Sequence, residues 1–247
     1  RKAAMRLVET DVKRVDITPR DLQELLGVPH YQDNARSRQD QIGVVNGLAW
    51  TEVGGELLEV EAGVMDGSGK LELTGNLGKV MQESVQAAYT CLRSRAAELG
   101  IPRDFYKTKD IHVHFPEGAV PKDGPSAGIA IATAMLSALT GRPVRHDVAM
   151  TGEVTLRGRV LPIGGLKEKT MAAKRSGIRT VIIPKENEKD LEEIDQTVRA
   201  ALRFVTAETV DAVFAHALAL PKKEAAVEHL TAMAGLERQE VRCGDQL

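Results

Sequence analysis

One stretch of the sequence runs from a turn straight into a helical pattern: Pro121-Lys122-Asp123-Gly124-Pro125-Ser126-Ala127-Gly128. Turn-forming residues give way to small and apolar ones, which predicts a buried helix over residues 125–139. Ser126 would then lie in the first turn, where backbone N–H groups lack intrahelical acceptors and can stabilise an oxyanion. The same pattern also fits a Ser126 or Asp123 that only caps the helix, and capping serines are far commoner than nucleophiles.

A nucleophilic serine needs a base, and histidine is the usual one. His112 and His114 lie two residues apart in the strand predicted over residues 111–115, so their side chains share one face. This spacing allows a His–Ser pair or two ligands of a metal site, but no third ligand is spaced to complete such a site. Hydrogen-bonded histidines that line a cleft or an interface are the commoner arrangement.

Lysine can replace histidine as the base when burial or nearby positive charge keeps it neutral. In the helix predicted over residues 166–175, Lys169 lies at the margin of the apolar face. Lys167 and Lys174 project to the other side, so Lys169 is the lysine of this helix that can bury its ammonium group. The competing interpretation is an ordinary lysine that lays its stem along the helix and keeps its charge in water.

The flanking sequence alternates between strand and helix patterns. Strands are predicted over residues 44–50, 56–64, 111–115 and 180–184, with short ones within 147–160; helices are predicted over residues 79–99, 125–139, 166–175, 187–200 and 210–220. This irregular mixture predicts a two-layer α+β or α/β sandwich.

The sequence predicts four parts. Residues 1–28 have the pattern of short helices that end a preceding domain, with Thr18 as a helix N-cap, and residues 29–41 form a polar linker. The main domain covers residues 42–220, and residues 221–247 form a helix and tail with no assigned role. Because the chain starts at Arg1 rather than Met, we expect it to begin inside a longer protein.

Composition excludes several classes of protein. The 247 residues carry a net charge of −2 and are 43% hydrophobic but only 3% aromatic, which suits a globular protein with an aliphatic core. Neither the charge nor any basic stripe indicates nucleic-acid binding, and no apolar run is long enough to span a membrane. The two cysteines predict no disulfide framework. Neither residues 67–71 nor 78–80 form a phosphate-binding loop, and no G-x-S-x-G elbow is present.

Taken together, four motifs resemble the Lon protease family. They are GLAWTEVGG at residues 47–55, HVHFPEGAVPKDGPSAG at 112–128, MTGEVTLRG at 150–158 and LPIGGLKEK at 161–169. The order of the motifs and the 43-residue separation of Ser126 from Lys169 also fit, and the similarity covers residues 42–220. The motif around Ser126 is similar to that of A-type Lon enzymes rather than the membrane-anchored B-type.

The resemblance implies a Lon proteolytic-domain fold, with mixed sheets packed against helices, and a Ser–Lys dyad. Ser126 would be the nucleophile, Lys169 its base, and Thr151 a partner that orients the lysine. Four further residues would line the site: His112, His114, Glu117 and Asp123, the last in a loop that can occlude it. The chemistry would need no metal or organic cofactor.

The resemblance also implies a larger setting. Residues 1–28 would end the small α-domain of an AAA+ module, which binds ATP and Mg²⁺ outside this chain. The whole protein would be a cytoplasmic hexameric ring that degrades unfolded, tagged or regulatory proteins.

Two other functions remain open from the sequence. A Ser–Lys hydrolase could act on its own chain or on a small amide. Alternatively, the chain could be an assembly module in which Ser126 is a helix cap and Lys169 a surface lysine.

Overall fold

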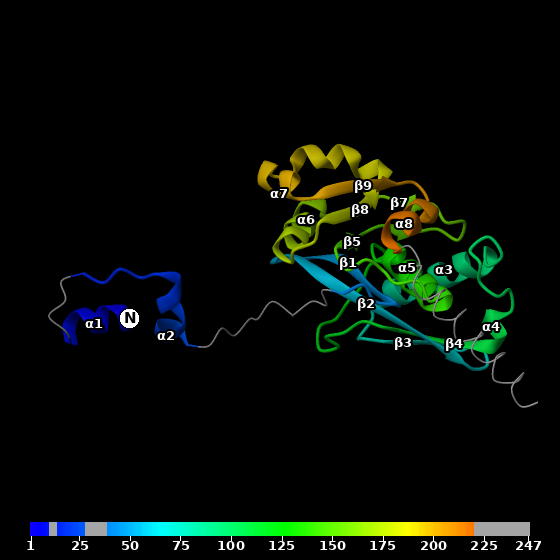
Figure 1. Cartoon of the computed structure of the whole chain (residues 1–247), viewed down its shortest axis with the longest axis horizontal. Coiled ribbons are helices and arrows are strands. Elements are labelled where there is room, and N and C mark those ends of the chain that lie inside the picture. Colours follow the sequence, from blue (N-terminus) through cyan, green and yellow to red (C-terminus); the bar gives the residue numbers. More distant parts are fainter. Residues whose placement is uncertain (10–13, 28–38, 220–247) are drawn as a thin grey trace, which may run out of the picture. The chain divides into compact units, whose positions relative to one another are not determined.

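The computed structural model of the chain describes residues 1–9, 14–27 and 39–219 (Figure 1). The chain divides into two units, Arg1–Arg36 and Ser37–Leu247. Most of the predicted linker over residues 29–41 and all of the predicted helix and tail over 221–247 lie outside the described residues.

Within residues 1–9 and 14–27, the first unit contains two α-helices and a single 3-10 turn. These elements are α1 (Lys2–Glu9), η1 (Pro19–Asp21) and α2 (Leu22–Leu26). The backbone N–H and the hydroxyl of Thr18 both donate to the Asp21 carboxylate, at 2.8 and 2.7 Å, so Thr18 opens this helical segment as predicted. Gly27 ends it with a φ of 91°, a backbone conformation that a side chain would strain.

The second unit is built around a seven-stranded sheet in the order β3-β4-β2-β1-β5-β8-β9. Its strands are β1 (Val44–Thr51), β2 (Gly54–Asp66), β3 (Leu71–Thr74), β4 (Lys109–His114), β5 (Val148–Met150), β8 (Thr180–Pro184) and β9 (Arg203–Ala207). Only the β1–β2 and β2–β4 pairs are antiparallel; the other four pairs are parallel. A separate ribbon pairs β6 (Glu153–Val154) with β7 (Val160–Leu161). The predicted mixed α/β fold is therefore confirmed.

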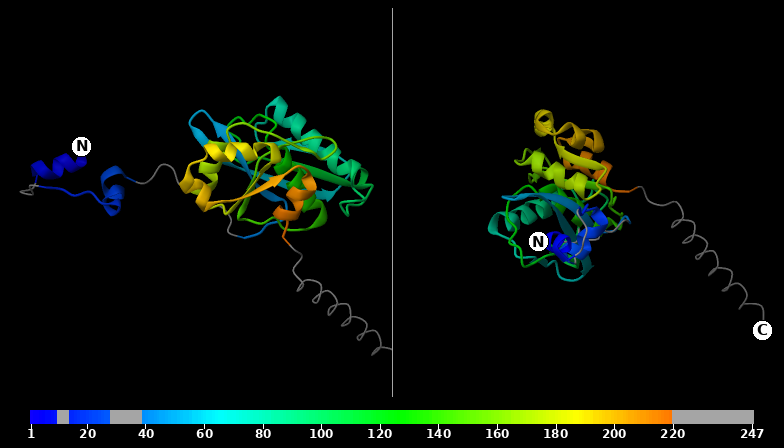
Figure 2. Two further views of the ribbon diagram at one scale, coloured as in Figure 1. Left: turned by 90° about the horizontal axis from the view of Figure 1, so that it is seen from above. Right: turned by 90° about the vertical axis from the view of Figure 1, so that its left-hand side faces the viewer.

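Helices cover both faces of this sheet, so the fold has three layers and the predicted two-layer arrangement was wrong. Helices α3 (Lys79–Ser94), α5 (Gly128–Thr140) and α8 (Val210–Ala217) pack in the larger core, and the short α4 (Phe105–Thr108) adds Phe105 to it. Helix α6 (Leu166–Arg175), η2 (Lys185–Glu193) and α7 (Gln196–Ala201) border the second core. Strand β5 shows how the sheet separates the two cores: Val148 and Met150 point into the first core, and Ala149 points into the second. Figure 2 shows the yellow η2–α7 region and the teal α3 on opposite sides of the sheet.

Several predicted boundaries were wrong. The helix predicted from residue 125 begins at Gly128, and the one predicted over residues 79–99 ends at Ser94. Residues 187–200 do not form one helix, because η2 and α7 are separated at Ile194, which adopts an extended backbone. Three short elements, β3, β9 and α4, were not predicted. Each has only four or five residues, which is too short for a periodic pattern to be recognised.

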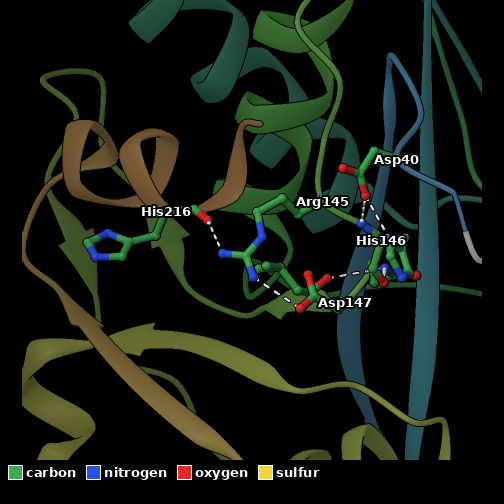
Figure 3. A network of polar contacts seen from close by, with 7 residues as sticks. Asp40, Arg145, His146, Asp147 and His216 are labelled. Carbon is green, nitrogen blue, oxygen red and sulfur yellow. Dashed lines mark hydrogen bonds and ion pairs between the residues drawn. The ribbon is translucent and has the colours of Figure 1, made fainter. Parts of the chain in front are cut away.

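Polar contacts attach Asp40 and His216 to the loop before β5 (Figure 3). The Asp40 carboxylate accepts hydrogen bonds from the backbone N–H of His146, at 3.0 Å, and pairs with its ring Nδ1, at 2.7 Å. Partial burial tends to raise the pKa of Asp40, but its contacts with His146 outweigh burial and hold that pKa below its ordinary value. Arg145 donates to the Asp147 carboxylate and to the carbonyl of His216. Residues 40–41 and 216–218 are thereby both anchored to the loop that leads into β5.

Candidate active site

Ser126 lies in a tight turn immediately before α5, two residues earlier than the helix itself begins. Two backbone contacts hold this turn: Gly128 N–H donates to the Pro125 carbonyl at 3.1 Å, and Gly152 N–H donates to the Ser126 carbonyl at 2.8 Å. A Cβ on Gly128 would meet the backbone nitrogen of Val154 at 2.7 Å, so only glycine permits this close approach. The side chain of Ser126 remains partly exposed.

The backbone N–H groups at this turn are available to a ligand. Within residues 39–219, neither Ser126 N–H nor Ala127 N–H donates a hydrogen bond to the protein. Both precede a helix of 13 residues whose N-terminal dipole favours negative charge. Adjacent free donors of this kind can stabilise the oxyanion that forms when a serine attacks a carbonyl.

Lys169 is buried on α6 with 2% of its surface exposed, whereas Lys167 and Lys174 on the same helix are exposed. Its ammonium nitrogen donates to Thr151 Oγ1 at 3.1 Å, inside the protein. The side chain therefore does not extend along the helix to water, which was the competing interpretation. Burial lowers the pKa of Lys169 from its ordinary value to about 8.

Thr151 links the lysine to the serine turn. It follows β5 directly, is fully buried, and its hydroxyl donates to the Ser126 carbonyl at 3.3 Å while accepting from Lys169. Helices α5 and α6 lie on opposite faces of the sheet, but the Ser126 turn before α5 and Lys169 on α6 both contact Thr151 at the carboxyl end of β5. Sites in open α/β sheets occur at such strand ends.

The surroundings of Lys169 let it lose its proton at a lower pH than an ordinary lysine does. Among the described residues, no carboxylate forms an ion pair with Lys169, and burial is the one cause of its lowered pKa. A buried lysine that only stabilises a fold is usually paired with an acid. Lys169 instead has the properties of a base that can accept a proton near neutral pH.

His112 and His114 occupy a different set of contacts. Both point away from the core on β4, and Thr74 Oγ1 on the neighbouring strand contacts His112 Nε2 at 2.8 Å and His114 Nδ1 at 2.7 Å. Their rings are in edge contact, with centroids 6.4 Å apart. Within residues 39–219, no hydrogen bond or ion pair joins either histidine to Ser126 or Lys169.

Asp123 and Glu117 belong to the loop before Ser126. The Asp123 carboxylate accepts hydrogen bonds from Met81 N–H at 2.9 Å and Gly124 N–H at 2.8 Å, so it caps the first turn of α3. The backbone carbonyl of Glu117 accepts from Lys122 Nζ at 2.7 Å, and Glu117 adopts a positive φ of 61°. The structure thus links Lys169 to the Ser126 backbone through Thr151, while Asp123 and Glu117 belong to the loop that leads to Ser126.

Replacing Asp123 by alanine is expected to destabilise the fold by about 1 kcal/mol, because the first turn of α3 loses a cap. Urea unfolding of the 247-residue chain measures this change. Asp123→Asn keeps an acceptor oxygen and should lose less stability than Asp123→Ala. Equal stability for Asp123→Ala and the unmodified chain would contradict a capping role.

Two contributors to the site lie within the quoted motifs, but the sequence did not predict the contacts that they make. The N–H of Gly152 fixes the Ser126 carbonyl, and the backbone at Gly55 packs against the peptide unit that joins Glu168 to Lys169. Both depend on backbone approach between segments that are remote in sequence, and residue types alone do not reveal it.

The described residues contain no cluster of three His, Cys, Asp or Glu side chains arranged to hold a metal ion. In the same part of the chain, every helix is too short or too polar to cross a membrane.

Comparison with known proteins places this chain in a family. Residues 16–220 match the family model described as "Lon protease (S16) C-terminal proteolytic domain". A Lon protease of Brevibacillus choshinensis is 57% identical over 218 residues, which are 88% of this chain and 28% of that protein. A Lon protease of Vibrio parahaemolyticus is 59% identical over 212 residues, 86% of this chain and 27% of that protein. Lon protease 1 of Bacillus subtilis is 55% identical over 223 residues, 90% of this chain and 29% of that protein.

The matched region includes all four motifs on which the resemblance was based. The chain spans between a quarter and a third of the length of these curated relatives. The predicted family is confirmed, and with it the expected class of enzyme, since Lon proteases form a family of serine endopeptidases. The chain belongs to the Lon protease family, within its C-terminal proteolytic domain.

Proposed function

We propose that this chain cleaves peptide bonds with Ser126 as nucleophile and Lys169 as general base. The observation that carries the proposal is a buried, unpaired lysine whose ammonium nitrogen contacts Thr151, the residue that also binds the Ser126 backbone. Membership of a serine endopeptidase family supports the same assignment.

The proposed reaction begins when neutral Lys169 takes the proton of the Ser126 hydroxyl. Ser126 Oγ bonds to the carbonyl carbon of the substrate, and the N–H groups of Ser126 and Ala127 stabilise the resulting oxyanion. Lys169 then returns the proton to the leaving amine as the C–N bond breaks. Water, activated by Lys169, hydrolyses the acyl-enzyme and regenerates the Ser126 hydroxyl.

Thr151 has a positioning role in this proposal. Its hydroxyl accepts from Lys169 Nζ, so its lone pairs orient the amine while its proton is donated to the Ser126 carbonyl. Asp123, Glu117 and the two histidines are proposed to shape the substrate-facing surroundings, with Asp123 able to alter access because its loop leads into Ser126.

Replacing Thr151 by valine is expected to lower kcat by about 100-fold, because Lys169 loses its orienting partner with little change in side-chain volume. Thr151→Ser retains a hydroxyl and should keep most of the activity. Steady-state hydrolysis of a fluorogenic peptide by the two variants measures the difference. Similar rates for valine and serine variants would contradict the positioning role.

The whole protein is proposed to be an ATP-dependent Lon protease. The chain's relatives are three to four times its length, which supports a preceding AAA+ module that binds ATP and Mg²⁺. In this proposal residues 1–28 end that module, residues 42–220 form the proteolytic domain, and the ring is a cytoplasmic hexamer. Its substrates are unfolded or tagged proteins.

An activity-based probe tests the nucleophile directly. An alkyl fluorophosphonate phosphonylates activated serines, so intact mass should rise by one adduct, and peptide mapping should place the adduct on Ser126. Labelling should increase as pH rises through about 8, since neutral Lys169 activates the hydroxyl. An adduct elsewhere, or equal labelling after Lys169→Met, would contradict the proposed dyad.

A further inference from the structure

The hairpin formed by β1 and β2 lies against α6, the helix that carries Lys169 (Figure 1). The two strands are in register at its end, where Trp50 pairs with Gly55 and Thr51 with Gly54. The Thr51 hydroxyl closes the turn by donating to the Gly54 carbonyl at 2.9 Å. This end of the hairpin is therefore a rigid support rather than a free loop.

Gly55 touches the backbone of α6 at the residue before the lysine. An ideal Cβ at position 55 would lie 2.0 Å from the carbonyl oxygen of Glu168, 2.4 Å from its carbonyl carbon and 2.9 Å from the backbone nitrogen of Lys169. Ordinary contacts between heavy atoms are about 3.5 Å. A methyl group would thus force the hairpin and the helix apart by roughly 1 Å or more, and helix backbone cannot rotate away as a flexible side chain can.

Two further contacts fix the same helix to the same hairpin. The side chain of Trp50 lies over Gly165, the N-cap of α6, where a Cβ would meet the Trp50 ring at 2.8 Å. At the other end of α6, Arg175 donates to the Gly55 carbonyl at 3.2 Å. The hairpin therefore sets the position of α6 at its start, at Lys169 and at its end.

We propose that Gly55 is a positioning residue of the Ser126–Lys169 site, whose missing side chain lets the hairpin seat α6 where Lys169 reaches Thr151. This inference rests on the proposed function. The contact acts on the peptide unit that joins Glu168 to Lys169, so any displacement is transmitted to the Cα of Lys169. The hydrogen bond to Thr151 at 3.1 Å has no slack to absorb a shift of that size.

Gly55→Ala should therefore hydrate the Lys169 ammonium and raise its pKa from about 8 toward the ordinary lysine value. At pH 7 each unit of increase reduces the neutral fraction about tenfold, and kcat/KM should fall by the same factor. The deficit should shrink as pH rises above about 8, where Lys169 of the unmodified chain is already mostly neutral, and should disappear above the raised pKa of the variant. A purely structural defect would lower activity at every pH alike.

The test is NMR titration of the 247-residue chain with ¹³C-labelled lysine Cε, in which the Lys169 signal is assigned by its absence from Lys169→Met. This readout needs no catalytic activity. The matched control is Gly63→Ala on the same strand β2, where an added Cβ meets nothing within 4 Å. We expect an upward shift of the Lys169 titration in Gly55→Ala and none in Gly63→Ala.

The outcomes separate the inference from the proposed function. If Lys169 of the unmodified chain titrates like an ordinary lysine, the proposed base fails. If it titrates near 8 in both the unmodified chain and folded Gly55→Ala, the inference about Gly55 is overturned. Should Gly55→Ala not fold, Arg175→Met replaces it, because it removes the donor to the Gly55 carbonyl at an exposed position. A smaller upward shift supports the inference, and no shift overturns it.

Discussion

Ser126→Ala is expected to reduce peptide hydrolysis by at least about 10³-fold while leaving the fold intact. The hydroxyl is the proposed nucleophile, and removing the nucleophile of a serine protease typically costs about as much activity as removing the whole catalytic set. The side chain is partly exposed and its hydroxyl makes no hydrogen bond among the described residues. Unfolding should therefore occur at the same denaturant concentration as in the unmodified chain.

Hydrolysis of an unstructured fluorogenic peptide measures this effect, in the 247-residue chain and in the full-length protein. Ser94→Ala is the matched control, because Ser94 is exposed at the end of α3 and donates only to the nearby Cys91 carbonyl. Undiminished hydrolysis by Ser126→Ala would remove Ser126 from the mechanism and return it to the role of a turn residue. A loss shared by Ser94→Ala would point to damage of the fold.

Lys169→Met is expected to abolish activity and at the same time to stabilise the protein at pH 7. The pKa of Lys169 is about 8 in the folded protein and near 10.4 when unfolded, so the unfolded chain binds more protons between these values. Its burial therefore opposes folding at neutral pH, by about 3 kcal/mol. Methionine has a similar length and no charge to desolvate.

The pH dependence of this effect follows from the sign of the shift. Folding stability of the unmodified chain should rise between about pH 8 and pH 10.5 through this group, whereas Lys169→Met lacks that increase. Urea unfolding at pH 7 and pH 10 measures both proteins. Lys167→Met, at an exposed position of the same helix, should change stability by no more than about 0.5 kcal/mol. A Lys169→Met variant that is less stable at pH 7 would contradict this account.

These two variants also separate the functions that the sequence left open. If the chain is an assembly module, Ser126→Ala should slightly lower the free energy of unfolding, and neither variant should change any hydrolytic activity. A hydrolase that acts on its own chain would depend on Ser126 and Lys169 but would not cleave unfolded protein in a ring. A Lys169→Met variant that is more stable but no longer hydrolyses peptides is expected only when burial of the lysine serves catalysis.

Periodicity and composition were enough to predict the longer elements. The apolar run of residues 180–184 and the amphipathic pattern after Lys79 produced β8 and α3 close to the expected positions. The short β3 and β9 were not predicted because four or five residues do not establish a period. Their pairing with β4 and β8 defines them instead. Helix α5 begins later than predicted because Pro125 and Ser126 form a turn held by Gly152, which is remote in sequence.

The sequence by itself determined the family, the mixed α/β class and the identities of the candidate dyad, because motifs at residues 47–55, 112–128 and 150–169 are contiguous and local. It did not determine that Lys169 is buried, since periodicity placed it only at the margin of an apolar face. Tertiary structure decided this: the Ser126 turn and Lys169 on α6 both reach Thr151 at the end of β5, and Gly55 seats α6 closely enough for Thr151 to receive the ammonium group. The pKa of a lysine depends on the solvent that surrounding elements exclude, and that quantity exists only in the folded protein.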